Sequence, residues 1–344
     1  MTEIPSLPWV GRPRLGGGAR VPDRAPTWAG SSEDAWLDEE RWSAEPVRPP
    51  QLGGSVPRQP AEPPTPDPPE SWQENWYGHT DLLRRHHLDD HTAVYVDRDV
   101  DHSRLQHLTR HVSELWRYCK QTYGDDFGAD PRVYAIFHQG RHYGGHAVGR
   151  TDPVKGYRNV IDVGDGSWHP RPDIYEVTIH EIGHLVEGES NGVSGSPAYP
   201  LWGDSKWAEF FIHDVYAALG VRDAVPFRNG MLQGSDDFPR PGTAWFRDWF
   251  HPMWIDAHGP STMVAFFRLL ATHFPRDRSG IRYARGMNWG EYLHFTSAAA
   301  GGDLRRRAVR AFGVPQQWST APALPDEWIA QWDRARDEFP GLRY

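Results

Sequence analysis

YEVTIHEIGHLVEGES, residues 175–190, contains the motif His-Glu-x-x-His within a largely apolar stretch. In an α-helix, His180 and His184 lie one turn apart on the same side, so both imidazoles can bind one tetrahedral Zn²⁺. Glu181 lies about 100° around the helix from His180, beside such a metal rather than on it. That position suits a carboxylate that takes a proton from a metal-activated water.

The residues around the motif support a buried helix. The chain has 18 histidines in 344 residues, so a chance His-Glu-x-x-His is a real false-positive risk. One apolar stripe, on the side away from the histidines, comprises Ile174, Thr178, Ile182 and Leu185. Ile179 and Val186 cover another side. A buried helix that carries His, Glu and His needs partners for these polar groups inside the fold.

A third zinc ligand is expected in the helix predicted over residues 206–219. Glu209 lies on this helix, and the intervening loop lets the helix return its carboxylate to the metal. The other acidic candidates are Asp204, Glu189 and Glu187. The last two follow the second histidine on the same or the adjoining turn, where convergence on one metal is awkward.

The HEIGH motif at 180–184, followed by Glu209 in a second helix, resembles the gluzincins, the thermolysin-like superfamily of zinc metallopeptidases. The resemblance covers about residues 92–220. It implies that the two motif histidines and Glu209 bind Zn²⁺ and that Glu181 is the general base. It also implies an α+β, zincin-like metallopeptidase domain, with a small mixed sheet and an active-site helix, followed by a mainly α-helical C-terminal lobe.

The resemblance has two limits. Gluzincins often carry an Asp four residues after the ligand Glu, but here that residue is His213, and Asp214 is one position further. On an ideal helix Asp214 points about 140° away from Glu209, which puts a role beside the metal in doubt. The longer metzincin motif is absent, because Glu187 and Ser190 occupy its last two fixed positions.

Hydrophobic periodicity predicts strands first and mainly helices later, which is typical of an α+β fold. Strands are predicted at 92–96, 132–138 and 159–163. Helices are predicted at 103–123, about 172–187, 206–219, 244–257, 260–274, 288–299, 303–312 and 325–337. Asp101 or Ser103 is the expected N-cap of the first helix. The expected division is a proline-rich, mostly disordered arm (1–72) and a catalytic domain (73–344), itself divided into 73–200 and 201–344.

Composition restricts the partners. The net charge of −9 argues against nucleic acid or an anionic membrane, and no stretch has the apolar length of a membrane helix. No signal-peptide pattern is seen at the N-terminus, and Cys119 is the single cysteine, so a cytoplasmic location is expected. The partners expected are a peptide or protein substrate and, for the proline-rich arm, a binding partner.

Two further clusters have ordinary explanations. His138, His142 and His146 recur every four residues, but intervening glycines argue against a helix, so a strand end and loop are predicted. A second metal site or a flap over the cleft are the alternatives. Asp97, Asp99 and Asp101 resemble the start of a calcium loop without its glycine and glutamate, so helix capping is the preferred interpretation.

The main hypothesis is hydrolysis of a peptide or related amide, with an extended substrate paired to an edge strand, 132–138 or 159–163. Tyr292, His294 and His251 are candidates for stabilising the oxyanion. One alternative is a non-catalytic, zinc-stabilised interaction protein with a partner-binding arm. Another is a metal-free interaction module. Glu181 favours the enzyme, because neither rival uses a carboxylate at this position.

Overall fold

In a computed structural model, all six strands of the main sheet precede the motif helix along the chain. The structure describes residues 67–165, 168, 172–316 and 319–344. In spatial order the strands are β1 (Ser71–Gln73), β2 (Leu82–Leu88), β3 (Thr92–Val96), β4 (Val133–Phe137), β6 (Asn159–Val163) and β5 (Gly145–Val148). The central strands β3, β4 and β6 are parallel, and the others pair antiparallel.

The three predicted strands are confirmed as β3, β4 and β6, but none of them is an edge strand. β4 lies between β3 and β6, and β6 lies between β4 and β5, so neither 132–138 nor 159–163 can pair with a substrate. The sheet ends at β5, which the sequence analysis assigned to a glycine-rich loop. The edge strands of the described sheet are β1 and β5.

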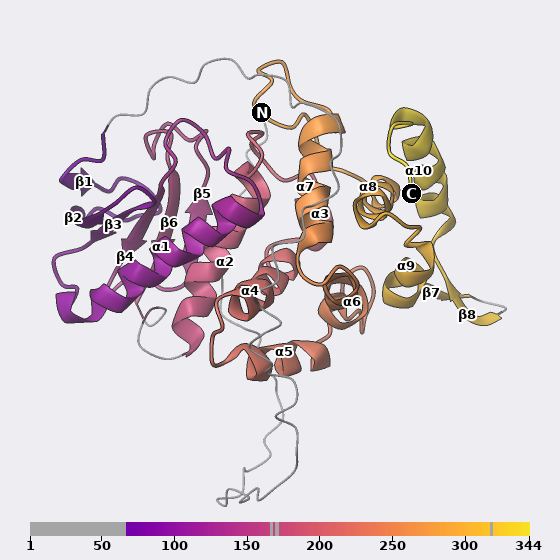
Figure 1. Ribbon diagram of the computed structural model, residues 1–344, viewed down its shortest axis with the longest axis horizontal. Helices are drawn as coiled ribbons and strands as arrows, with labels where there is room; N and C mark the ends of the chain where they lie inside the picture. Colours follow the sequence, from indigo (N-terminus) through magenta and orange to yellow (C-terminus); the bar gives the residue numbers. More distant parts are fainter. Residues whose placement is uncertain (1–66, 166–167, 169–171, 317–318) are drawn as a thin grey trace, which may run out of the picture. The chain divides into compact units, whose positions relative to one another are not determined.

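Two long helices cover one face of the sheet (Figure 1). They are α1 (Leu105–Thr122) and α2 (Pro172–Glu189), the second of which carries the motif. Alternate strand residues such as Val94, Ala135 and Ile161 point into their shared core. The predicted N-cap is confirmed, because Asp101 accepts a hydrogen bond from the backbone N–H of Ser103 at 3.0 Å.

The opposite face of the sheet has a separate, smaller core. Tyr95, Tyr134 and Val160 project from it and pack with Trp72 and Trp76 of the β1–β2 segment. This alternation follows from the two-residue period of a strand, which sends neighbouring side chains to opposite faces. The connection between β1 and β2, residues 74–81, therefore lies over this face, with Trp76 hydrogen-bonded to Asp162 of β6.

The chain beyond α2 is mainly helical, as predicted. Its helices are α3 (Tyr199–Trp202), α4 (Lys206–Ala218), α5 (Ala224–Gln233), η4 (Trp245–Phe250), α6 (His251–Asp256), α7 (Ser261–His273), α8 (Trp289–Ala300), α9 (Arg305–Phe312) and α10 (Asp326–Glu338). A hairpin of β7 (Val314–Gln316) and β8 (Ser319–Ala323) follows α9. Much of the tryptophan serves the core; fully buried examples are Trp202, Trp207 and Trp249.

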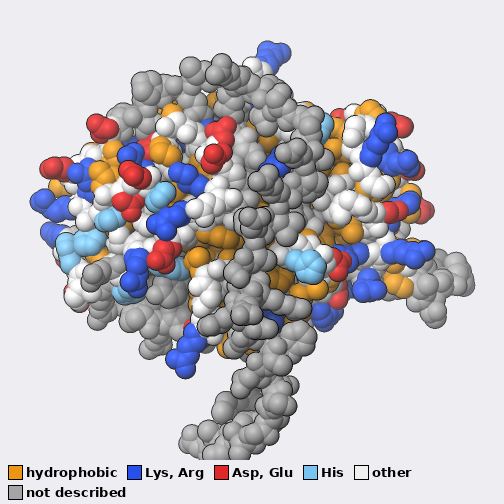
Figure 2. Space-filling model, viewed as in Figure 1, with side chains coloured by type: hydrophobic (Ala, Val, Ile, Leu, Met, Phe, Trp, Pro, Cys, Tyr) orange, Lys and Arg blue, Asp and Glu red, His pale blue; other side chains and the backbone are white. Residues whose placement is uncertain are grey.

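The described residues all belong to one compact unit, and one large apolar core draws on both the α+β part and the helical part. Most of the predicted arm, residues 1–66, lies outside the described residues, and β1 begins at Ser71 inside its predicted end. Lys and Arg side chains alternate with Asp and Glu over the visible surface (Figure 2). None of the described helices combines the length and apolarity that crossing a bilayer requires.

Asp214 joins three helices inside this core. It is fully buried on α4 and accepts hydrogen bonds from Tyr118 Oη (2.5 Å), Tyr123 Oη (2.7 Å) and Trp254 Nε1 (2.8 Å). Burial raises the pKa of this carboxyl group, although the three donors oppose the shift. Asp214 is therefore a packing residue between α1, α4 and α6, consistent with its predicted direction away from Glu209.

We expect Asp214→Ala to lower the free energy of unfolding by about 3 kcal/mol, because it leaves three buried donors without an acceptor. Urea unfolding followed by circular dichroism measures the loss. The exposed Asp237→Ala is the matched control and should change stability by less than about 0.5 kcal/mol. Equal stability of the two variants would contradict this account of the core.

Candidate metal centre on the motif helix

Helix α2 brings the two motif histidines together as predicted. His180 Nε2 and His184 Nε2 lie 3.2 Å apart, and both rings are largely buried. The helix packs closely on α4, because a Cβ at Gly183 would meet Phe211 at 2.9 Å. Trp207 Nε1 donates to the Gly183 carbonyl at 3.0 Å. The glycine in the motif therefore allows α4 to approach the metal-binding turn.

Asp204 is the carboxylate that joins this pair. It lies in the turn between α3 and α4, with Oδ1 3.3 Å from His184 Nε2 and Oδ2 3.6 Å from His180 Nε2. Ligands of a tetrahedral zinc are separated by about 3.3–3.4 Å when metal–nitrogen bonds are about 2.0–2.1 Å. The three side chains thus form one face of such a tetrahedron, and they fit a zinc ion.

Glu209 does not belong to this group of three. It lies half-buried in the first turn of α4, more than one helical turn beyond Asp204. The sequence analysis expected α4 to bring a carboxylate back to the histidines. The chain instead reaches them earlier, in the turn that precedes α4. Asp204, the first of the alternatives to Glu209, is the carboxylate that lies with the two histidines in this group.

The other two acidic alternatives have different partners. Glu187 lies 3.3 Å from His184 Nδ1 and accepts hydrogen bonds from Trp202 Nε1 (2.6 Å) and from Ser196 Oγ. A carboxylate at Nδ1 holds the ring so that Nε2 faces the metal position. Glu189 instead pairs with Arg150 Nε at 3.0 Å. Glu187 therefore orients a ligand, and Glu189 stabilises the end of α2.

The carboxylates around the histidine pair make the electrostatic potential there strongly negative. Burial opposes protonation of His184, but Asp204 and Glu187 raise its pKa to about 10. Burial also opposes ionisation of Asp204, yet contacts with both motif histidines lower its pKa. The same field would favour a dication at the point that the three side chains share.

Glu181 is buried against strand β5. A Cβ at Gly145 would lie 2.7 Å from Glu181 Oε1 and 2.9 Å from Val177 Cγ1, so only glycine permits this approach. Burial raises the pKa of Glu181, while His180 and His184 oppose the shift. The carboxylate is thus held between the two motif histidines and the edge strand.

The predicted oxyanion candidates have other contacts. Tyr292 is buried in the helical core and accepts a hydrogen bond from Trp249 Nε1 at 2.7 Å. His294 lies 3.0 Å from Tyr344 Oη, and His251 packs against the ring of His213.

Tyr199 of α3 is a residue that sequence reasoning missed. Burial and the nearby carboxylates of Asp204 and Glu187 raise its pKa. The phenol of Tyr199 is therefore within electrostatic range of both carboxylates. The sequence places Tyr199 five residues before Asp204. This position indicates nothing until Asp204 is known to lie beside the two histidines.

The three aspartates that resemble a calcium loop serve separate purposes. Asp97 Oδ2 lies 3.1 Å from His138 Nδ1, and Asp99 pairs with Arg141. Asp101 caps the 3₁₀ turn η3 (His102–Arg104). The preferred interpretation of capping is therefore confirmed for Asp101, whereas Asp97 belongs to a histidine cluster on the other face of the sheet.

Comparisons with known proteins add little to this geometry. No protein-family model and no curated protein matches the chain. A similar solved structure is described as "a functionally unknown conserved protein from Bacillus anthracis str. Ames". It shares 11% identity with a TM-score of 0.44, over 72% of this chain and 50% of that one. The chain thus spans about half the length of that protein. The described fold is α+β, with a mixed sheet and many helices.

We expect Asp204→Asn to lower the zinc content by about one ion per chain, because an amide is a poorer zinc ligand than a carboxylate. Glu209→Gln, the matched control on the next helix, should keep the wild-type content. Plasma mass spectrometry of the purified proteins measures both. Loss of zinc in the Glu209 variant alone would restore the original prediction.

Gly145→Ala tests the contact between β5 and Glu181. The added methyl group would overlap Glu181 Oε1, so the carboxylate must shift and turnover should fall by about 100-fold, as for a displaced catalytic group. Gly230→Ala on α5, where a Cβ meets nothing within 4 Å, is the control. Hydrolysis of a quenched peptide library is the measurement. Full activity of Gly145→Ala would show that the contact does not position Glu181.

Proposed function

We propose that the protein is a metal-dependent hydrolase, and specifically a zinc metallopeptidase with a zincin-like catalytic domain. The single observation that carries the proposal is the convergence of His180, His184 and Asp204 beside the buried carboxylate of Glu181. Asp204 replaces Glu209 in the proposed ligand set. This modifies the gluzincin pattern that the sequence resembles.

Three protein ligands favour an enzyme over a structural zinc site. Structural zinc sites usually have four protein ligands, whereas catalytic sites keep one position for water or substrate. Among the described residues, the group around the motif histidines has three members. This supports the catalytic hypothesis over the non-catalytic, zinc-stabilised alternative.

A bound zinc would supply Lewis acidity, by lowering the pKa of the attacking water and polarising the scissile carbonyl. Glu181 then accepts the proton of that water and passes it to the leaving amine. Burial of Glu181 suits both proton transfers, because it raises the pKa of the carboxyl group and so makes the group easier to protonate. Tyr199 can donate a hydrogen bond to the carbonyl oxygen as negative charge develops.

Strand β5 offers a place for the substrate. Its backbone pairs with β6 on one side and lies at the end of the sheet on the other. An extended peptide can add to such an edge through main-chain hydrogen bonds. Because Gly145 touches Glu181, a peptide on this strand would pass close to the general base.

We expect Glu181→Gln to reduce peptide hydrolysis by at least about 100-fold while the zinc content stays at the wild-type level, because the amide cannot accept the proton. A library of quenched peptides and plasma mass spectrometry provide the two readouts. His184→Ala should lose the activity and one zinc ion per chain. Full activity of Glu181→Gln, or no hydrolysis by the zinc-loaded wild type, would overturn the proposal.

A further inference from the structure

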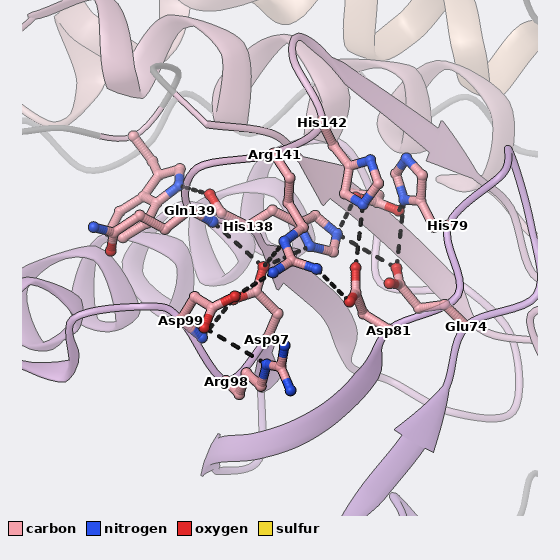
Figure 3. Close-up of polar contacts among 12 residues, drawn as sticks. Glu74, His79, Asp81, Asp97, Arg98, Asp99, His138, Gln139, Arg141 and His142 are labelled. Carbon is pink, nitrogen blue, oxygen red and sulfur yellow. Dashed lines mark hydrogen bonds and ion pairs between the residues drawn. The ribbon is translucent and has the colours of Figure 1, made fainter.

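We propose a second metal site, for a divalent transition ion of the zinc class, on the face of the sheet opposite α2. Its ligands are Glu74, His79, His138 and Asp162. Figure 3 shows Glu74 and His79, from the connection between β1 and β2, turned toward His138 at the end of β4. This site is independent of the motif helix and of the proposed hydrolysis.

The fold gathers these side chains at one end of the parallel strands. His138 directly follows β4, and Asp162 lies near the end of the neighbouring strand β6. Asp162 takes the alternate position to Ile161, so it faces away from the helices. Glu74 and His79 come from the connection between β1 and β2, which covers this face.

The distances suit ligands of one ion. His79 Nδ1 lies 3.5 Å from Glu74 Oε1 and 3.3 Å from Asp162 Oδ2. His138 Nε2 lies 3.4 Å from Glu74 Oε1 and 3.1 Å from Asp162 Oδ1. These four separations lie near the roughly 3.3–3.4 Å between ligand atoms of a tetrahedral zinc, with Asp162 offering a different oxygen to each histidine. Glu74, His79 and His138 also form one group with His142, in which one ligand atom of each residue lies within 4.8 Å of the others.

The same atoms are buried without hydrogen-bond partners. The unpaired atoms are Glu74 Oε1 and Oε2, His79 Nδ1, His138 Nε2 and Asp162 Oδ1. All four residues are at least 93% buried, so water cannot replace the missing bonds. Short separations without hydrogen-bond geometry are expected of ligands that point at a common centre rather than at one another. Leaving such groups unsatisfied costs about 1–3 kcal/mol each, and a bound cation removes that cost.

The contacts on the outer side of His138 fix its orientation. Asp97 Oδ2 lies 3.1 Å from His138 Nδ1 and accepts a hydrogen bond from the Nδ1–H group, since a carboxylate cannot donate one. Nε2 is then the nitrogen that faces the cluster. A carboxylate behind a histidine in this way is the usual support of a metal-binding imidazole. On the carboxylate side, Trp76 Nε1 donates to Asp162 Oδ2 at 2.9 Å.

The rival explanation is an ion network in which protons replace the metal. Three carboxylates, those of Asp162, Asp97 and Glu74, lie within 3.4 Å of the ring nitrogens of His138. The cluster therefore demands positive charge. The neighbouring ammonium group of Lys155 does not meet this demand by direct contact, because it lies over the ring of Trp76, 3.2 Å from the centroid, and makes no hydrogen bond to these carboxylates. A dication satisfies the carboxylates and both nitrogen lone pairs together.

The site would link the β1–β2 connection to the strand that faces the motif helix. His146 of β5 pairs in register with Asp162, and its Nε2 lies 3.5 Å from Asp162 Oδ2. The residue before it, Gly145, is the one that contacts Glu181. An ion bound to Asp162 would therefore stiffen β5 without taking part in the reaction.

The test is the metal content of the full chain in variants that separate the two sites. After reconstitution with Zn²⁺ and desalting, the wild type should hold about two ions and His184→Ala about one. Adding Glu74→Gln or Asp162→Asn to His184→Ala should remove the remaining ion. Adding Asp99→Asn is the matched control, because this nearby carboxylate binds Arg141 rather than the proposed ion, and should leave the count at one.

Cobalt(II) gives a second readout, since a tetrahedral ion in the His184→Ala variant should show visible absorption that Asp162→Asn abolishes. A folded His184→Ala protein that holds no ion would overturn the second site, as would an unchanged count in both cluster variants. If His184→Ala retains everything that the wild type binds, the centre on α2 fails instead. Asp204→Asn replaces His184→Ala should the latter not fold, as judged by circular dichroism.

Discussion

The fit of helix α2 between α4 and the edge strand β5 is the constraint on which the site depends. Glycines make the contact possible on both sides: Gly183 admits the ring of Phe211, and Gly145 admits the carboxylate of Glu181. A side chain at either position would have to displace its neighbour. Because both contacts are tight, the two histidines and the glutamate are held at fixed positions without any loop carrying them.

Each buried polar side chain of α2 has its own partner in a neighbouring part of the fold. Glu187 meets His184 and the indole of Trp202, whereas Glu189 meets Arg150, although only two residues separate the two carboxylates. Each charge is therefore matched inside the fold, as burial requires. The centre on α2 and the cluster on the far face share this logic, since in both a carboxylate supports one imidazole nitrogen and leaves the other facing inward.

The elements with strong local patterns were predictable from the sequence. Residues 92–96 and 159–163 are buried strands with continuous β-forming side chains, and the spacing of His180 and His184 defines their side of the helix. β5 was missed because Gly145 and His146 lack that pattern and the strand is formed by pairing with β6. Asp204 lies in a turn, and Glu74 lies in a connection far from His138 in the sequence. Turns and connections have no hydrophobic periodicity, so the sequence did not indicate that these two carboxylates lie beside histidines.

Strand β5 also bears on the solubility of the protein. In the described sheet it has one paired side, so its other backbone groups are open to pairing with any extended chain. The feature that would admit a substrate is thus also a template for self-association. The strand is only four residues long, Gly145–Val148, and a short edge gives an aggregating partner few hydrogen bonds. Because β5 is so short, its unpaired side would be accessible to a substrate and yet form too few hydrogen bonds to support fibre growth.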